Sequence, residues 1–150
     1  MSEDGAIDAA KALGLDVAVT RHGPVRSLPE AAAARGIEPA RLIKTIVVRL
    51  ADDDYRFVLV PGDREISWPK LRALLGVNRL SMPDAGTAKD VTGYERGTIT
   101  PLGSTHAWPV IADASITGTI SIGGGAHGVG LTVDAARLFE ALKADVSDVT

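Results

Sequence analysis

The sequence contains no cysteine, few aromatic residues and no long apolar run. Without cysteine there are no disulfides and no thiolate metal sites, a composition that fits a reducing compartment. No apolar run is long enough to cross a bilayer, and the acidic N-terminal stretch lacks the basic-then-apolar order of a secretion signal. We therefore expect a cytoplasmic protein that does not bind membranes.

A surplus of positive charge is also missing, because the formal net charge is −3 at pH 7. Proteins that wrap a long stretch of nucleic-acid backbone usually carry a basic surplus, so we expect no DNA partner. A local basic pocket stays open as an interpretation, since five basic residues lie close together in the sequence, at Arg21, Arg26, Arg41, Lys44 and Arg49. The alternative is that most of them are solvated surface charges.

Patterns for metals and dinucleotides are absent or incomplete. The three histidines show no spacing typical of metal ligands, so we predict no metal. Gly123, Gly125 and Gly128 fit the pattern G-x-G-x-x-G, which requires a helix after the glycines. The stretch 129–133 instead reads as a strand, and too little chain follows for a nucleotide-binding sheet. We predict a glycine-rich connection between strands and no cofactor.

Hydrophobic periodicity predicts an α+β fold, organised as one domain over residues 1–150. Two runs rich in β-branched and aromatic residues, 43–50 and 55–61, flank three aspartates and predict an antiparallel hairpin. Other strands are expected at 16–20, 77–82, 108–113, 118–123 and 129–133, and helices at 7–15, 27–36, 67–76, 83–93 and 134–146. This irregular alternation favours a mixed, largely antiparallel sheet or barrel-like core surrounded by short helices.

The strand at 42–50 carries a lysine on its more apolar side. Lys44 alternates with Leu42, Ile46 and Val48, whereas Thr45 belongs to the other face. Burying an ammonium group without a partner is costly. The side chain therefore either reaches solvent at the end of the strand, as amphipathic lysines often do, or lines a pocket and meets an anion.

Two glycine-rich segments can present backbone groups to a ligand. In 92–103, Gly97 and Pro101 form a G-x-x-x-P spacing that frees the backbone at one point and fixes it at another. The same spacing is typical of a turn before an edge strand. In 121–130, glycine N–H groups can approach ligand oxygens and His127 can donate a hydrogen bond, or His127 is a solvent-exposed loop residue.

Taken in order, the segments 42–49, 92–103 and 121–138 closely resemble the YbaK/EbsC family, with "VPGDREISWPKLRALLG" and "PVIAD" between them. The resemblance extends from about Val17 to Leu142. The family shares its fold with the editing insertion of bacterial prolyl-tRNA synthetases. The resemblance implies a free-standing trans-editing aminoacyl-tRNA deacylase, which hydrolyses the ester between a wrong amino acid and the tRNA 3′ end.

The family's motifs fall on particular residues of this chain. Its lysine falls on Lys44, its G-x-x-x-P loop on 97–101 and its glycine-rich loop on 123–128, while His22 and Pro24 match an H-x-P stretch. The residues implied as catalytic are Lys44, Gly97, Gly123 and Gly124. The residues expected to bind substrate are Arg21, His22, Thr45, Thr98, Ile99, Thr100, Pro101, Asp113, Gly125 and His127. Asp113 is equally typical of a turn aspartate that bonds its own backbone.

Three positions depart from the relatives that clear cysteine from tRNA. Those relatives carry a tyrosine, a serine and an aspartate where this chain has Arg21, Gly123 and Gly130. The departures leave the lysine and the G-x-x-x-P loop intact. Cysteine, alanine and serine therefore all stay open as the amino acid removed, with the proline tRNA as one carrier.

The chemistry expected of these residues is ester hydrolysis by water. The Lys44 cation can hold the terminal phosphate or the junction of sugar and amino acid, and backbone N–H groups can stabilise the oxyanion. Ser104, Thr105 and His106 are adjacent but lack the nucleophile-elbow pattern. The expected partners are the aminoacyl-tRNA 3′ end and an aminoacyl-tRNA synthetase or elongation factor that delivers it. The alternative is a non-catalytic module that binds a nucleotide or an aminoacyl-adenosine-like ligand.

Overall fold

A computed structural model describes residues 3–150, so the first two residues of the predicted span 1–150 lie outside it. The strands are β1 (Ala18–Arg21), β2 (Ile43–Ala51), β3 (Asp54–Pro61), β4 (Val110–Asp113), β5 (Thr119–Gly123), β6 (Val129–Asp134) and β7 (Asp145–Ser147). The helices are α1 (Glu3–Ala12), α2 (Leu28–Ala34), α3 (Trp68–Leu75), α4 (Ala85–Thr92) and α5 (Ala135–Leu142), with a 3₁₀ turn η1 (Pro39–Arg41). None of the helices in this part of the chain has the length and apolar character needed to span a membrane.

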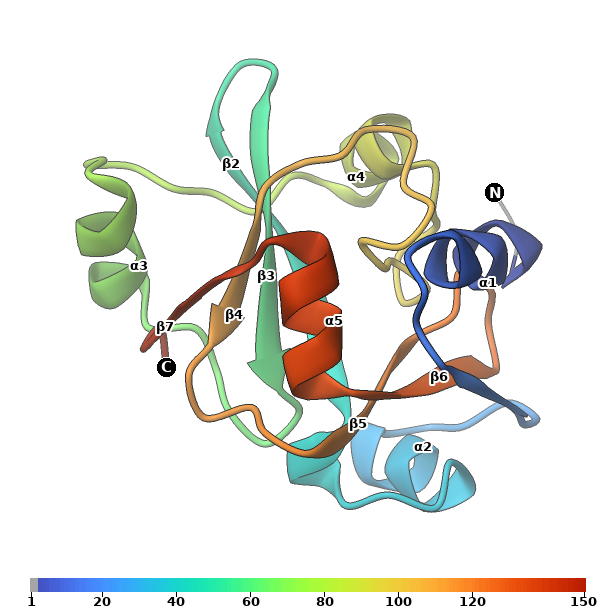
Figure 1. Ribbon diagram of the computed structural model, residues 1–150. Helices are drawn as coiled ribbons and strands as arrows, with labels where there is room; N and C mark the ends of the chain where they lie inside the picture. The colour runs from blue at the N-terminus through green and yellow to red at the C-terminus, as the bar shows by residue number, and fades with distance from the viewer. Residues whose placement is uncertain (1–2) are drawn as a thin grey trace.

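The strands form two sheets (Figure 1), in the orders β1-β6-β5 and β2-β3-β4-β7. The first is antiparallel throughout, and the second combines the predicted β2–β3 hairpin with parallel pairing of β4 to β3 and of β7 to β4. A parallel bridge between Leu42 and Ser121 joins the two sheets. The mixed α+β prediction is confirmed, but over residues 3–150 the sheets do not close into a barrel.

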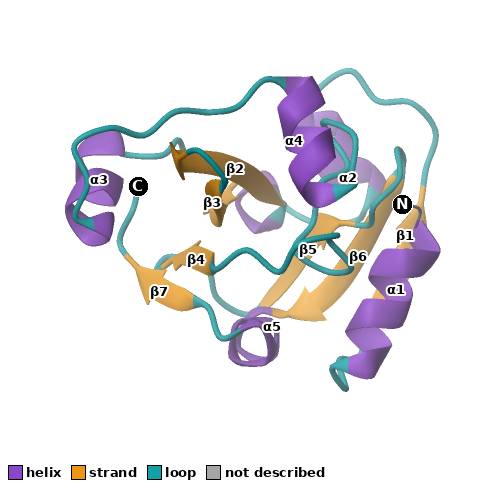
Figure 2. Ribbon diagram, turned by 90° about the horizontal axis from the view of Figure 1, so that it is seen from above, coloured by secondary structure: helices purple, strands orange, loops and turns teal. Residues whose placement is uncertain are grey.

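The main hydrophobic core lies between the two sheets, and a smaller one lies under α3. Phe57 and Leu59 of β3 face the main core, whereas Val58 and Val60 face the smaller one. Because successive strand residues point to opposite faces, β3 needs apolar side chains on both sides. Figure 2 shows the result, with α3 at one end of the molecule and α1 beside β1 and β6 at the other.

Three expectations about the elements differ from the structure. The strand predicted at 77–82 is wrong, because Ser81 alone pairs there, exchanging backbone hydrogen bonds with Arg49. The first helix runs from Glu3 to Ala12 rather than over 7–15. The last helix ends at Leu142 rather than at 146, and the chain continues into the short strand β7, because three residues carry no periodic signal of their own.

Candidate active site

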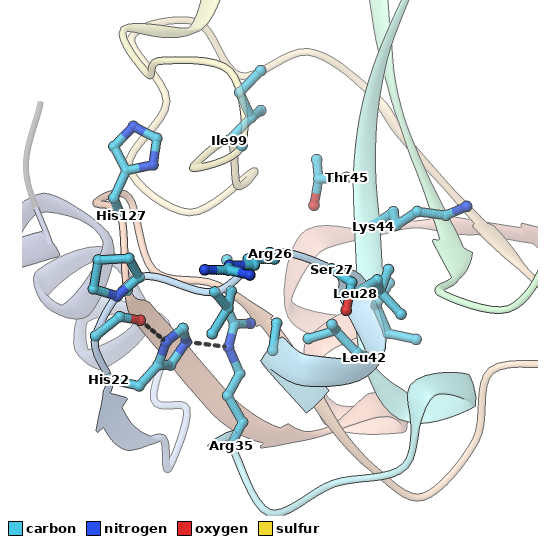
Figure 3. Close-up of a pocket in the computed structure, with 18 residues that line it drawn as sticks. His22, Arg26, Ser27, Leu28, Arg35, Leu42, Lys44, Thr45, Ile99 and His127 are labelled. Atoms are coloured by element: carbon cyan, nitrogen blue, oxygen red, sulfur yellow. Dashed lines mark hydrogen bonds between the residues drawn. The ribbon is translucent and has the colours of Figure 1, made fainter. Parts of the chain in front are cut away.

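A cavity of about 760 Å³ opens where α2, the start of β2 and the two glycine-rich segments meet (Figure 3). It therefore gathers segments that lie far apart in the sequence, at the junction of the two sheets. Its lining residues are His22, Gly23, Pro24, Val25, Arg26, Ser27, Leu28, Ala31, Arg35, Leu42, Ile43, Lys44, Thr45, Gly97, Ile99, Gly123, His127 and Gly128.

The two glycine-rich segments touch each other at Gly123. A Cβ atom at this position would lie 3.0 Å from the carbonyl oxygen of Ile99 and 3.4 Å from that of Thr98. Glycine at this position lets the 97–101 loop lie against the end of β5 without the small shift that a side chain would require. The glycine-rich 123–128 segment is a connection between β5 and β6, as predicted, and not a strand-to-helix turn.

Seven of the predicted site residues line the cavity, and seven others lie outside its lining. Those in the lining are His22, Lys44, Thr45, Gly97, Ile99, Gly123 and His127. Those outside it are Arg21, Thr98, Thr100, Pro101, Asp113, Gly124 and Gly125. The N–H group of Gly124 donates to the Val129 carbonyl at 3.0 Å, so in this conformation it is not available to an oxyanion.

Two of the outer residues stabilise the loop. The buried Thr98 hydroxyl donates to the Glu95 carbonyl at 2.7 Å, and the buried Thr100 hydroxyl accepts from the Leu102 N–H at 3.3 Å. Both hydroxyls thus bond to backbone groups of the same loop region. Their effect is to fix the path of the 97–101 backbone, not to contact a ligand.

Asp113 corrects a prediction, because it anchors the C-terminal segment instead of facing the cavity. It is 1% exposed; its carboxylate accepts from the Val149 N–H at 2.9 Å and from the Ser115 N–H at 3.2 Å. Burial acts to raise the pKa of Asp113, but hydrogen bonds from Ser115, Val149 and Thr150 outweigh it and leave that pKa below its usual range. The turn-aspartate interpretation is the one that fits.

Lys44 and Thr45 point in different directions from β2 (Figure 3). The Lys44 ammonium donates to the Arg64 carbonyl at 2.6 Å and lies 3.3 Å from the Glu65 carboxylate, so only its stem lines the cavity. The Thr45 hydroxyl is buried and has no hydrogen-bond partner within residues 3–150. A buried hydroxyl without a partner is unfavourable, but the Thr45 oxygen has almost no accessible surface, so a ligand reaches it only if the cavity wall shifts.

Sequence reasoning did not select Arg35, which lies in the cavity wall. Its Nε donates to His22 Nε2 and its Nη1 to Ser121 Oγ, both at 3.3 Å. Burial lowers the pKa of Arg35, because removal from water disfavours its charged form. The sequence does contain a pattern that points to Arg35. This residue follows the buried Ala31 by four positions and therefore lies on the same face of the helix.

The lining is cationic although the chain as a whole is acidic. Arg26, Arg35 and Lys44 line the cavity, and none of its lining residues is an aspartate or glutamate. At the rim, His127 Nε2 lies 3.3 Å from the Glu95 carboxylate. In the described part of the chain, no group of three or more histidine, aspartate or glutamate side chains is arranged to hold a metal ion. The site is therefore suited to anionic ligands.

The sequence model of the aminoacyl-tRNA editing domain family matches residues 22–141, which include every residue that lines the cavity. The chain belongs to this family. Its fold and its cavity are therefore those of an aminoacyl-tRNA editing domain.

The chain is also similar in sequence to part of several proline–tRNA ligases. The chain is 38% identical over 79 residues to a proline–tRNA ligase of Caldicellulosiruptor saccharolyticus, covering 53% of this chain and 14% of the ligase. It is 29% identical over 109 residues to that of Lactobacillus gasseri, covering 73% of this chain and 19% of the ligase. The chain thus spans less than a fifth of the length of these curated relatives.

Two solved structures share the fold over nearly their whole length. A crystal structure described as a candidate trans-editing enzyme for prolyl-tRNA synthetase superposes with a TM-score of 0.89 at 22% identity, covering 99% of this chain and 96% of the other. The hypothetical protein APE2540 superposes with a TM-score of 0.85 at 27% identity, covering 97% and 98%. The fold is therefore that of an editing domain.

Proposed function

We propose that this protein is a free-standing, single-domain aminoacyl-tRNA deacylase that acts in the cytoplasm and hydrolyses the ester of mischarged tRNA. The observation that carries the proposal is the cavity, which Arg26 and Arg35 line together with the backbone of Gly97 and Gly123 and without any carboxylate. A charged tRNA end offers phosphate, ribose hydroxyls and an ester carbonyl, which match these groups. The cavity volume of about 760 Å³ suits a nucleotide-sized ligand.

Water is the proposed nucleophile. Ser27 lines the cavity, but its oxygen accepts from the Glu30 N–H at 3.2 Å as the cap of α2, and none of the described hydrogen bonds joins it to a base. Water attacks the ester carbonyl carbon, the bond to the ribose oxygen breaks, and the amino acid leaves as a free acid. Backbone N–H groups of Gly97 and Gly123 stabilise the oxyanion, each donor contributing about 2.7–4 kcal/mol in comparable sites.

Lys44 is proposed to bind the phosphate or the junction of sugar and amino acid after a short side-chain movement. Its present partner, Glu65, has a side chain that is 91% exposed. Exposed ion pairs contribute about 0–1 kcal/mol, so the pair opposes this movement only weakly. The Thr45 hydroxyl, which is buried and has no hydrogen-bond partner within residues 3–150, is proposed to bind the ligand when the cavity wall shifts.

The proposed substrates are tRNAs charged with alanine, cysteine or serine. Val25, Leu28, Ala31 and Ile99 give the cavity an aliphatic wall that suits a small side chain. The similarity to proline–tRNA ligases supports the proline tRNA as carrier. Because the chain is acidic overall, it is proposed to bind the body of the tRNA only weakly. A synthetase or elongation factor is proposed to deliver the tRNA to it.

A panel of charged tRNAs tests the proposal. Purified protein is incubated with proline tRNA carrying labelled alanine, cysteine or serine, and the release of the amino acid is followed against a protein-free control. The proposal predicts faster release from at least one of them. Saturable binding without release of any amino acid would instead favour the non-catalytic binding module.

A further inference from the structure

Arg35 is a charged side chain in the cavity wall without a counterion. It caps the C-terminus of α2, and its backbone N–H lies 3.1 Å from the Ala31 carbonyl and 3.2 Å from that of Ala32. Within residues 3–150, the hydrogen bonds of its guanidinium go to neutral groups and no carboxylate pairs with it. A guanidinium remains charged in proteins, so the removal of water here favours the binding of an anion.

Three contacts fix the direction of this side chain. The bond from Nε to His22 Nε2 is drawn in Figure 3, together with the bond from His22 Nδ1 to the Gly23 carbonyl at 2.9 Å. Nη1 donates to the Oγ of Ser121, which is 1% exposed. The third contact is with β6, since a Cβ at Gly130 would lie 2.7 Å from both Cδ and Nε of Arg35. Glycine at position 130 therefore lets the arginine lie against the strand.

The guanidinium keeps donors for a ligand. Of its five N–H groups, two are used, which leaves one on Nη1 and two on Nη2. This planar arrangement matches the oxygens of a phosphate or a carboxylate. Arg26 and Lys44 line the same cavity without any acidic side chain, and several cations suit a phosphate of a polyanionic chain better than a single carboxylate.

We infer that Arg35 anchors a phosphate subsite, and that its ligand is the phosphate on the 5′ side of the terminal nucleoside of the tRNA. The inference deepens the proposed function and rests on it for the identity of the nucleic acid. Figure 3 draws Arg35 and Ile99 on opposite sides of the cavity. Gly123 pairs with Gly130, the residue against which Arg35 lies, and the 97–101 loop touches Gly123. A nucleoside whose phosphate is held at Arg35 therefore brings its ester to Gly97 and Gly123.

The test compares AMP with adenosine, which differ only in the phosphate, by calorimetric titration of the full chain. The wild-type protein is expected to bind AMP about tenfold more tightly than adenosine. Arg35→Gln loses this preference while it keeps its affinity for adenosine. Arg35→Lys, which retains the charge but not the planar fork, shows a smaller preference. As a matched control, Arg79→Gln removes a positive charge outside the cavity lining and keeps the preference.

Gly130→Ala is a second variant that retains the arginine and displaces it from β6, so it also lowers the preference for AMP. Equal binding of AMP and adenosine by the wild type overturns the subsite, as does an unchanged preference in Arg35→Gln. A lower melting temperature with an unchanged ratio of affinities would make Arg35 merely structural and would also overturn it. Competition by inorganic phosphate as strong as that by AMP contradicts a nucleotide ligand.

The outcomes for the subsite and for the proposed function are separate. A protein that hydrolyses no charged tRNA, yet prefers AMP through Arg35, keeps the phosphate subsite and loses the deacylase assignment. A protein that deacylates tRNA, yet binds AMP as well after Arg35→Gln, keeps the deacylase assignment and loses the subsite.

Discussion

At the residue scale, the position of the Lys44 ammonium makes its role depend on a movement. It lies 2.6 Å from the Arg64 carbonyl and 3.3 Å from the Glu65 carboxylate, away from the glycine segments. A lysine in this position serves the reaction only if it leaves these partners when substrate binds. In the structure, the Lys44 side chain reaches outward at the end of the strand. This matches the alternative that the sequence left open.

Lys44→Ala is expected to lower the second-order rate constant for deacylation by tenfold or more, because a phosphate or sugar contact is lost. Glu65→Gln removes the competing carboxylate and leaves the rate equal to that of the wild type or higher. Single-turnover release of the labelled amino acid measures both variants. A wild-type rate in Lys44→Ala would remove the lysine from the mechanism.

Asp113 gives a prediction about stability and pH. Its pKa is lowered in the folded protein, so its contribution to stability is present above the unfolded-state pKa of about 3.9 and is lost as the pH falls through the lower folded value. We expect Asp113→Asn to cost about 1–3 kcal/mol at pH 7, since hydrogen bonds to a buried charged group are weakened. Urea titrations at pH 7 and pH 3 should show this difference shrinking at the lower pH. A difference that stays constant would contradict the assignment.

At the element scale, the contact between the 97–101 loop and β5 depends on the absence of a Cβ atom at Gly123. Gly123→Ala is expected to push the Ile99 carbonyl away and to lower deacylation by about tenfold, as one oxyanion donor moves out of place. Gly86→Ala, inside α4, is the matched control, because its new Cβ would meet only Asp84 Oδ1 at 3.6 Å. That control should keep full activity and gain up to about 1 kcal/mol of stability. Equal activity of the two variants would argue against a role for the loop contact.

The elements also show which features sequence patterns can predict. The β2–β3 hairpin, the caps at Ser67 and Asp134 and the amphipathic α5 follow from local periodicity and capping chemistry. The parallel pairing of β4 to β3, the short β7 and the direction of the Lys44 side chain depend on tertiary packing. The motifs select Gly97, Gly123 and Thr45, which line the cavity, but also Gly124 and Gly125, which do not. They miss Arg35, because only the folded chain brings it beside Gly130.

At the scale of the whole molecule, an acidic chain carries a cationic cavity. The net charge of −3 disfavours contact with the body of a tRNA, whereas Arg26, Arg35 and Lys44 concentrate positive charge at one site. Under the proposed function, we therefore expect recognition of a tRNA terminus and not of a duplex. This arrangement agrees with delivery of the substrate by another protein of translation.

The salt dependence of binding reflects this charge distribution. Each phosphate neutralised on a single strand contributes about −0.7 to the slope of log affinity against log salt. With three cations in the lining, we expect a slope no steeper than about −2 for tRNA, measured by filter binding between 50 and 200 mM salt. Arg79→Gln should leave it unchanged. A slope several times steeper would show that the tRNA body is bound as well.

The most direct measurement of the central claim is the mapping of backbone amide shifts by solution NMR with a non-hydrolysable 3′-alanylamino-adenosine 5′-phosphate. We predict perturbations at Thr45, Gly97 and Gly123, together with the side-chain signals of Arg35. Perturbations confined to the separate hollow beside Lys11 and Thr132, or none at millimolar ligand, would contradict the assignment of this cavity to the charged 3′ end.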